Sequence, residues 1–370
     1  EALQAFRWGQ LQYATTTGIS LDSTNSIVPP LLDTDSTTTP LILDERACVG
    51  NLSRNILIQA PNDQTWTDSA FGVHIMLMGT GATAHIDGVE IRRGGQLGRM
   101  RRYPIHWHML SYAGTSTLGD ASGQYIQNSV IHESVNRGIV IHGTNGLLVK
   151  KNVLFQIQGH GIFTEDAVER RNTIDSNLVL NVRNSLIPLK QHETGTRGAS
   201  GFWISNPDNI VTNNHAADCE TNGFWLPFTT QPWGQSINVL ADDGGLLNPS
   251  RLRFGIFDNN TSHSNRLEGI MLDFVEIDTL GNTSPYQYMS TTDGRDIQYP
   301  YPTLRRFTLS RYKVWKNSSN GIWDRSVWPD NYEVVSADNC GRFFAGSGNG
   351  GVIERSLVVG TSLNHLMNGT

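Results

Sequence analysis

Three stretches of this chain share one frame: Asn152–Phe163 (NVLFQIQGHGIF), Asn214–Trp225 (NHAADCETNGFW) and Asn260–Met271 (NTSHSNRLEGIM). In each of them a glycine stands nine residues after the asparagine, and the same spacing leads from Tyr312 to Gly321. A frame that recurs along the chain is typical of a solenoid, in which each repeat packs only against its neighbours.

The segment after each glycine has the alternating character of a short strand: IVIH, IFTE, FWIS, FWLP, IMLD and IWDR. Such strands, separated by Asn/Gly turns and recurring at intervals of roughly 20 to 25 residues, predict an all-β fold, a right-handed parallel β-helix with long loop insertions. A doubly wound α/β fold would need amphipathic helices of about ten or more residues between the strands, and the intervals do not show them. We expect the repeated glycine to supply a corner with positive φ.

The chain divides into two parts. Residues 1–70 are irregular, with a Ser/Thr/Asp/Pro-rich stretch, and are expected to cap the helix, whereas residues 71–370 are expected to form its coils. Insertions at 181–200, 230–253 and 278–303 are too long for coil corners. Loops of this length in a compact fold are usually functional, often as the walls of a cleft.

Composition narrows the class of protein. The 370 residues carry a formal net charge of -6, which argues against nucleic acid as a partner. Charged residues make up only 17%, too few for a long salt-bridged helix, and no apolar run approaches the roughly 18 residues that span a bilayer. We therefore expect a chain without a membrane span, and a monomer.

Cysteines and glycosylation sequons bear on the compartment without deciding it. Cys48, Cys219 and Cys340 fit no zinc spacing and allow one disulfide at most. Sequons occur at Asn51, Asn259, Asn260, Asn282, Asn317 and Asn368. They would suit a secreted protein, but an Asn-rich chain also produces them by chance.

The alternation after each glycine predicts which side chains point outward. The first and third residues should fill the core, and the second should form an outer column that includes Trp203 and Trp225. A row of exposed tryptophans needs a cover. A substrate sugar ring and a long loop folded over the rings would serve equally, and we expect Trp203 and Trp225 to bind substrate.

A second outer column contains the candidate catalytic and metal-binding residues. His108, His142 and Glu165 should lie on three consecutive rungs and converge on one point. Two imidazoles and a carboxylate with an open position suit a catalytic divalent metal, Zn²⁺ or similar, with His106 or His160 able to replace one of them. Without a metal, Glu165 is a candidate acid for a glycosidic oxygen.

Neighbouring charged residues complete the candidate site. Asp166 is the one nearby second carboxylate, but strand alternation turns it away, where it can pair with an arginine such as Arg170. Arg102 and Arg137 flank the site, and either could hold a uronate carboxylate in a bidentate contact.

Longer blocks resemble one family, which contains the cell migration-inducing and hyaluronan-binding protein, transmembrane protein 2 and the fibrocystin-like proteins. The blocks are ERACVGNLSRNI (45–56), FGVHIMLM (71–78), RYPIHWHM (102–109), NRGIVIHGTNGLLVKKNV (136–153), GHGIFTEDAVERRNT (159–173) and SGFWISNPDNIVTNNHAADCETNGFWLPF (200–228). The resemblance implies a glycine-rich domain followed by a right-handed parallel β-helix, with residues 1–70 as a remnant of the former. The family's HxH, VIHG-like and GHxxFTED blocks fall on His106 and His108, on His142, and on His160, Glu165 and Asp166.

The resemblance also implies a substrate class and a compartment. Two of the family members are associated with extracellular hyaluronan depolymerisation, so a secreted or extracellular protein that acts on a polysaccharide is expected. Three functions stay open: a metal-assisted enzyme that cleaves a hyaluronan-like or other uronate-containing glycan, a noncatalytic glycan-binding or adhesion module, and a polysaccharide lyase. The catalytic candidates are His108, His142, His160, Glu165 and Asp166, and the metal candidates are His106, His108, His142 and Glu165.

Overall fold

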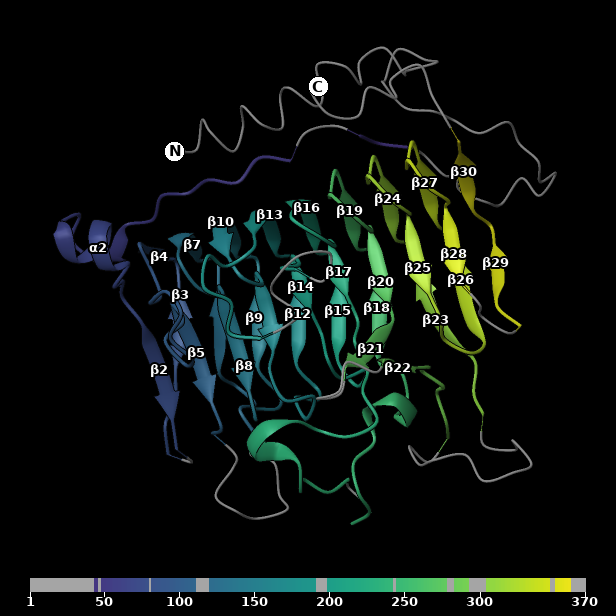
Figure 1. Cartoon of the computed structure of the whole chain (residues 1–370), viewed down its shortest axis with the longest axis horizontal. Coiled ribbons are helices and arrows are strands. Elements are labelled where there is room, and N and C mark those ends of the chain that lie inside the picture. Colours follow the sequence, from purple (N-terminus) through teal and green to yellow (C-terminus); the bar gives the residue numbers. More distant parts are fainter. Residues whose placement is uncertain are drawn as a thin grey trace.

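The computed structural model describes residues 43–45, 48–79, 81–110, 120–190, 198–241, 244–277, 283–292, 304–346 and 350–360. Three sheets of parallel strands run side by side along one axis, so that each coil of the chain adds one strand to each sheet (Figure 1). The predicted parallel β-helix is confirmed. Among the described residues, no helix is long and apolar enough to cross a bilayer.

Sheet 1 has ten strands. In spatial order they are β1 (Ile56–Gln59), β4 (Val89–Arg92), β7 (Val130–Ser134), β10 (Val153–Gln158), β13 (Leu178–Arg183), β16 (His215–Cys219), β19 (Thr261–His263), β24 (Lys313–Trp315), β27 (Val335–Ala337) and β30 (Leu357–Val359).

Sheet 2 carries the glycine-led strands of the repeat. Its nine strands are β2 (Ile75–Met78), β5 (Ile105–His108), β8 (Ile139–His142), β11 (Ile162–Thr164), β14 (Phe202–Trp203), β17 (Phe224–Trp225), β20 (Ile270–Leu272), β25 (Ile322–Asp324) and β28 (Phe344–Gly346).

Sheet 3 closes each coil. It consists of β3 (His85–Asp87), β6 (Tyr125–Gln127), β9 (Leu148–Lys150), β12 (Thr173–Asp175), β15 (Ile210–Thr212), β18 (Ile256–Asp258), β23 (Phe307–Ser310), β26 (Pro329–Tyr332) and β29 (Val352–Glu354).

Four short elements lie outside the three sheets: α2 (Gln64–Ser69), η3 (Gly234–Ser236), η4 (Pro249–Arg251) and an antiparallel hairpin of β21 (Phe274–Ile277) and β22 (Thr283–Tyr286). The two η turns belong to the expected 230–253 insertion. Among the strands that the structure describes, the hairpin is the one antiparallel pair. The described part of the 278–303 insertion is limited to 283–292.

The first sheet strand precedes the expected boundary at residue 71. Strand β1 pairs with β4 in parallel and so belongs to sheet 1. The described residues before it lie along the outside of the same sheet, where Leu43 packs on Trp315 and the Lys316 ammonium is 2.9 Å from a Glu45 carboxylate oxygen. This part of the 1–70 segment therefore covers sheet 1 along its length.

The repeated asparagine has a structural role. The Asn177 side chain accepts from the backbone N–H of Asn152 at 3.0 Å, and Asn214 accepts in the same way from Asn177. The ladder continues to Asn260 at 3.0 Å. Each rung thus satisfies a buried amide of the rung before it, which is why the asparagine recurs in the frame.

The repeated glycine is required for space and not for a positive φ. None of the glycines that lead sheet 2 strands has a positive φ, and the left-handed corners are taken by residues before the asparagine ladder, such as Lys151 and Ser176. A Cβ on Gly161 would lie 2.5 Å from the carbonyl oxygen of Gly201. Successive rungs approach so closely here that a side chain has no room, so the expected reason for this glycine was wrong.

Inward residues follow the predicted alternation. The first and third residues after each glycine, such as Ile139 and Ile141, lie in one core that extends through the helix. The three cysteines lie among the described residues and none is bonded to another.

Asp324 is an exception in this core. It occupies an inward position on β25 and is fully buried, with one oxygen accepting from the Ser326 N–H at 2.7 Å. The second oxygen, Oδ2, has no hydrogen-bond partner. Burial raises the pKa of Asp324 from 3.8 to about 6, against the hydrogen bonds from Ser326, which lower it.

We predict that Asp324→Asn stabilises the protein at neutral pH. Because the folded-state pKa is the higher one, the unfolded chain binds fewer protons between about pH 4 and 6, and stability falls as pH rises through this window. The shift of roughly two pKa units corresponds to a loss of about 3 kcal/mol in the free energy of unfolding at pH values above this window. In urea unfolding, the variant should have a free energy of unfolding higher than that of the parent by up to this amount at neutral pH, and equal to it near pH 4. A variant less stable than the parent at neutral pH would contradict the assignment.

Candidate active site

The candidate residues lie on the outer face of sheet 2. Strand β5 pairs with β8 so that His106 stands beside Val140 and His108 beside His142. Glu165 directly follows β11, and its N–H donates to the Ile141 carbonyl at 3.0 Å. The predicted register over three consecutive rungs is confirmed.

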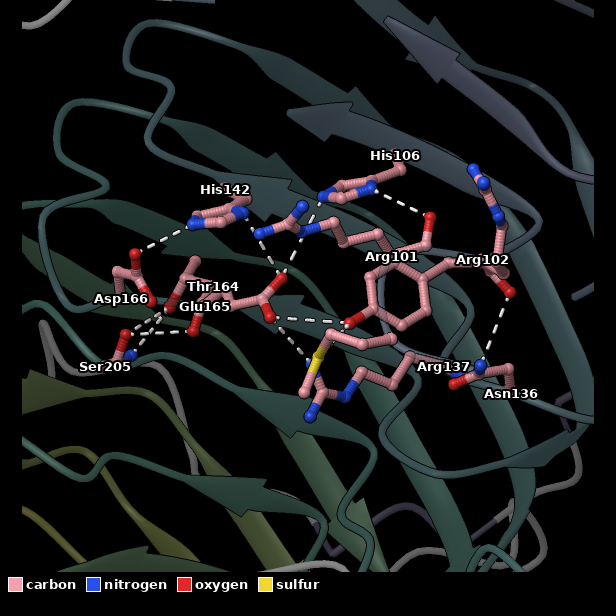
Figure 2. A network of polar contacts seen from close by, with 12 residues as sticks. Arg101, Arg102, His106, Asn136, Arg137, His142, Thr164, Glu165, Asp166 and Ser205 are labelled. Atoms are coloured by element: carbon pink, nitrogen blue, oxygen red, sulfur yellow. Dashed lines mark hydrogen bonds and ion pairs between the residues drawn. The ribbon is translucent and has the colours of Figure 1, made fainter. Parts of the chain in front are cut away.

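Three side-chain atoms from these rungs converge. Oε2 of Glu165 is 3.5 Å from Nδ1 of His142 and 3.9 Å from Nε2 of His106 (Figure 2). All three atoms lie within 4.8 Å of one another, and none has a hydrogen-bond partner. Buried polar atoms are normally paired, so such a group is what a cation would satisfy.

The opposite sides of the same residues are held in place. Nδ1 of His106 is 3.3 Å from the Arg101 carbonyl oxygen, and Nε2 of His142 is 2.7 Å from Oδ2 of Asp166. In the neutral form of each imidazole, with its proton on this nitrogen, both rings would donate outward and turn a lone pair toward Glu165. Metal-binding histidines are commonly oriented by such contacts.

Glu165 is fixed from its other oxygen. Oε1 accepts from the Tyr103 hydroxyl at 3.4 Å and from Nη1 of Arg137 at 3.3 Å. Arg137 in turn donates to the Tyr103 hydroxyl at 3.0 Å. Both donors engage one carboxylate oxygen and leave Oε2 directed toward the imidazoles.

His108 does not join this group, although the sequence predicted it as a member. Its ring packs edge-on against both His106 and His142, with centroids 4.9 Å apart in each case, and neither of its nitrogens has a hydrogen-bond partner. His106, two residues earlier on the same face, takes its place among the converging atoms. The structure thus brings together the alternative set that the sequence analysis allowed, with His106 in place of His108, since both side chains point outward from β5.

The electrostatics of the two imidazoles differ. Burial, reinforced by the charges of His142 and His108, lowers the pKa of His106 well below 6.5. Burial also opposes the charged form of His142, but the hydrogen bond to Asp166 and the charges of Glu165, Asp166 and Glu169 outweigh it and raise its pKa to about 9. The surrounding carboxylates therefore favour a positive charge on His142.

Asp166 faces the site, contrary to the expectation that it turns away. Its carboxylate contacts His142 and accepts from the Ser236 hydroxyl at 3.0 Å, while Arg170 pairs with Asp208. Strand alternation does not apply to Asp166, because β11 ends at Thr164. The contact with Ser236 also ties the 230–253 insertion to this end of the site.

Sequence analysis missed Glu169. One of its carboxylate oxygens accepts from the N–H of Gly143 at 2.8 Å and from the N–H of Asp166 at 3.1 Å. These amides directly follow His142 and Glu165, so Glu169 links the two rungs just beyond their functional side chains. Burial and the Asp166 charge raise the pKa of Glu169 to about 7. Nothing in the spacing marks this residue, since the VERRN turn has no strand period.

His160 lies away from the converging atoms. Its Nδ1 accepts from the Ser200 N–H at 3.1 Å, and its ring contacts Phe163 and Trp203. The structure therefore does not bring His160 together with His142 and Glu165.

The two arginines that were expected to bind substrate are engaged with the protein. Arg137 is fully buried behind Glu165, and its guanidinium also stacks 3.9 Å from the centroid of the Phe163 ring. Arg102 is half-buried, with Nη1 3.2 Å from Nε2 of His74. Arg137 is thus a support of Glu165, and its proposed contact with substrate is not available in this structure.

Trp203 and Trp225 point outward from sheet 2 but are covered. Their exposed fractions are 0% and 1%. They form a cluster with Tyr103, Val140 and Phe163, onto which Leu189 and Trp233 of the two insertions pack. The prediction of an exposed platform was wrong, and the alternative of a loop folded over the rings is confirmed.

These features define a class of molecule: a parallel β-helix with a buried His–His–Glu group of metal-ligand type on one outer face. The CEMIP β-helix family model matches residues 70–270. This match covers more than half of the chain, which therefore belongs to that family.

Comparison with individual proteins agrees with the family. The chain is 32% identical over 369 residues to human "Cell surface hyaluronidase CEMIP2", covering 87% of this chain and 26% of the relative. It is 30% identical to mouse "Fibrocystin-L" (86% of this chain, 8% of the relative) and 30% identical to mouse "Cell migration-inducing and hyaluronan-binding protein" (87% and 26%). The chain thus spans about a quarter or less of the length of these relatives.

Solved structures resemble the chain only distantly. The catalytic domain of a GH87 α-1,3-glucanase in complex with nigerose matches with a TM-score of 0.30 and 12% identity, over 78% of this chain and 63% of that one. The A-module of the mannuronan C-5 epimerase AlgE6 from Azotobacter vinelandii matches with a TM-score of 0.29 and 10% identity, over 77% and 90%. At this level neither similarity bears on the function of the chain.

We predict that Trp225→Ala destabilises the protein by about 3–5 kcal/mol, the usual loss for a buried aromatic ring. The ring packs edge-on against Trp203 at 4.7 Å, and its N–H donates to the Asp273 carbonyl at 2.9 Å. Urea unfolding measures the loss. A change within about 0.5 kcal/mol, as at an exposed site, would show that the ring is not packed as described.

Proposed function

We propose that this chain is part of an extracellular or cell-surface enzyme that cleaves glycosidic bonds in a hyaluronan-like or other uronate-containing polysaccharide with the help of a divalent metal ion. The observation that carries the proposal is the convergence of three metal-ligand atoms, on His106, His142 and Glu165, that have no hydrogen-bond partner. Family relatives named as hyaluronidases and as a hyaluronan-binding protein support the substrate class.

The donor set suits Zn²⁺ or a similar ion. Two imidazole nitrogens and one carboxylate oxygen leave room for a further ligand, as in catalytic zinc sites. A metal held there would polarise a sugar oxygen or activate a water molecule. Oxygen-only ions such as Mg²⁺ are less well matched to two imidazoles.

The chain's own residues would orient this chemistry. Asp166 holds the far nitrogen of His142, and Tyr103 with Arg137 holds the far oxygen of Glu165. His108, His142 and Glu165 are 5–8% exposed, whereas His106 is fully buried. The cluster is therefore nearly closed to solvent, and His108, His142 and Glu165 are its slightly exposed members.

In the hydrolytic reading, the C–O bond of the glycoside breaks, the hydroxyl of water joins the anomeric carbon, and a proton passes to the leaving oxygen. In the lyase reading no water is consumed: a proton leaves C5 of the uronate, the C4–O glycosidic bond breaks, a C4=C5 double bond forms, and the departing oxygen takes up a proton. A noncatalytic binding module was expected to use the tryptophan face, and the burial of Trp203 and Trp225 removes that support. We favour the enzyme, with a monomer as its expected state.

We predict that the purified chain, loaded with Zn²⁺, releases reducing ends from at least one member of a panel of uronate polymers that includes hyaluronan. His142→Ala should lower the rate at least 100-fold, since loss of a mere supporting contact at a metal site already costs 10–100-fold. His85→Ala is the matched control, because His85 stacks on Tyr125 in sheet 3, away from the cluster. Circular dichroism verifies that both variants are folded.

The same incubation separates the alternatives. Reducing ends without unsaturated uronate indicate hydrolysis, whereas ultraviolet absorbance from an unsaturated product indicates elimination. Binding of polymer without cleavage would overturn the enzymatic proposal in favour of a binding module. Equal rates and equal metal content for His142→Ala and the parent would remove this cluster from consideration.

A further inference from the structure

The arginines beside the cluster differ in what they contact. Arg137 is buried against Glu165, and Arg102 lies against His74. Arg101 is exposed, and within the described residues its guanidinium takes part in no ion pair or hydrogen bond. It is thus the one of these three arginines whose guanidinium has no contact of this kind within the described residues.

Arg101 lies next to the cluster. Its carbonyl oxygen lies 3.3 Å from Nδ1 of His106, which fixes the backbone to the site. Figure 2 shows its side chain extending toward His142, whereas the Arg102 side chain runs in the other direction. The charge of Arg101 also contributes, after burial and His142, to the lowered pKa of His108.

The local charges call for an anion at this point. The carboxylates of the cluster are already engaged: Glu165 with Arg137, and Asp166 with His142. A divalent cation between His106, His142 and Glu165 would add further positive charge beside Arg101. A ligand that places a carboxylate there would compensate both.

We propose that Arg101 binds the carboxylate of a uronate unit of the substrate and so sets the preference for acidic over neutral glycans. The proposal rests on the function proposed above and names the residue that recognises its substrate class. A guanidinium offers two parallel N–H donors that match a carboxylate, which a lysine ammonium cannot reproduce. This role had been expected of Arg102 or Arg137.

The test compares binding of a hyaluronan hexasaccharide with binding of its carboxyl-reduced, neutral counterpart, measured by isothermal titration calorimetry on the Zn²⁺-loaded chain. The parent should prefer the acidic form. Arg101→Ala should weaken binding of the acidic form about ten- to hundredfold and leave the neutral form unchanged, because a hydrogen bond to a charged group is lost. Arg101→Lys should restore only part of the affinity.

Arg99→Ala is the matched control, because it removes the same charge from another exposed arginine of the same loop. An equal loss in Arg99→Ala and Arg101→Ala, or no preference of the parent for the acidic form, would overturn the assignment. Reducing-end assays on the same samples separate the two proposals. Cleavage that does not depend on Arg101 would contradict this inference alone. Binding that depends on Arg101, without cleavage, would support the inference and contradict the enzymatic function.

Discussion

The close approach of successive backbones at the glycines of sheet 2 fixes the geometry on which the site depends. Gly138, Gly161, Gly201 and Gly269 each face the carbonyl oxygen of the next such glycine at a distance that leaves no room for a Cβ. This contact, repeated from coil to coil, aligns the strands that follow. Residues at equal distances from their glycines are therefore stacked, and the outward positions of β5, β8 and β11 become neighbours about 4.8 Å apart.

The candidate site combines buried donors with supports that lie behind them. Asp166 and Glu169 lie on the far side of His142, and Arg137 and Tyr103 lie behind Glu165. Each support contacts an atom that does not take part in the convergence, so the three facing atoms remain without hydrogen-bond partners. Burying polar atoms without partners is unfavourable, and strain of this kind is usually retained where a ligand relieves it.

The parts of the structure that follow a local period could be predicted from the sequence. The alternation after each glycine correctly placed Ile139 and Ile141 in the core and His108 beside His142. Asp166 follows the end of β11, where alternation stops, and its direction was predicted wrongly. Arg101 and Glu169 lie in turns on either side of the strands, where no period marks them.

Contacts between segments that are far apart in the chain could not be predicted from the sequence either. Trp203 and Trp225 do point outward, but Leu189 and Trp233 from two insertions cover them. Whether a long insertion folds over a face or leaves it open depends on tertiary packing, which periodicity does not encode. Selection of His106 over His108 likewise depends on side-chain geometry, since both residues point to the same face of β5.

The most direct test of the central claim is a crystal structure of the Zn²⁺-loaded chain with anomalous scattering recorded at the zinc absorption edge. The account predicts one strong anomalous peak at about 2.0–2.2 Å from Nε2 of His106, Nδ1 of His142 and Oε2 of Glu165. A zinc-loaded crystal with no peak there, or with His142 still separated from Glu165 by an unfilled gap, would contradict it.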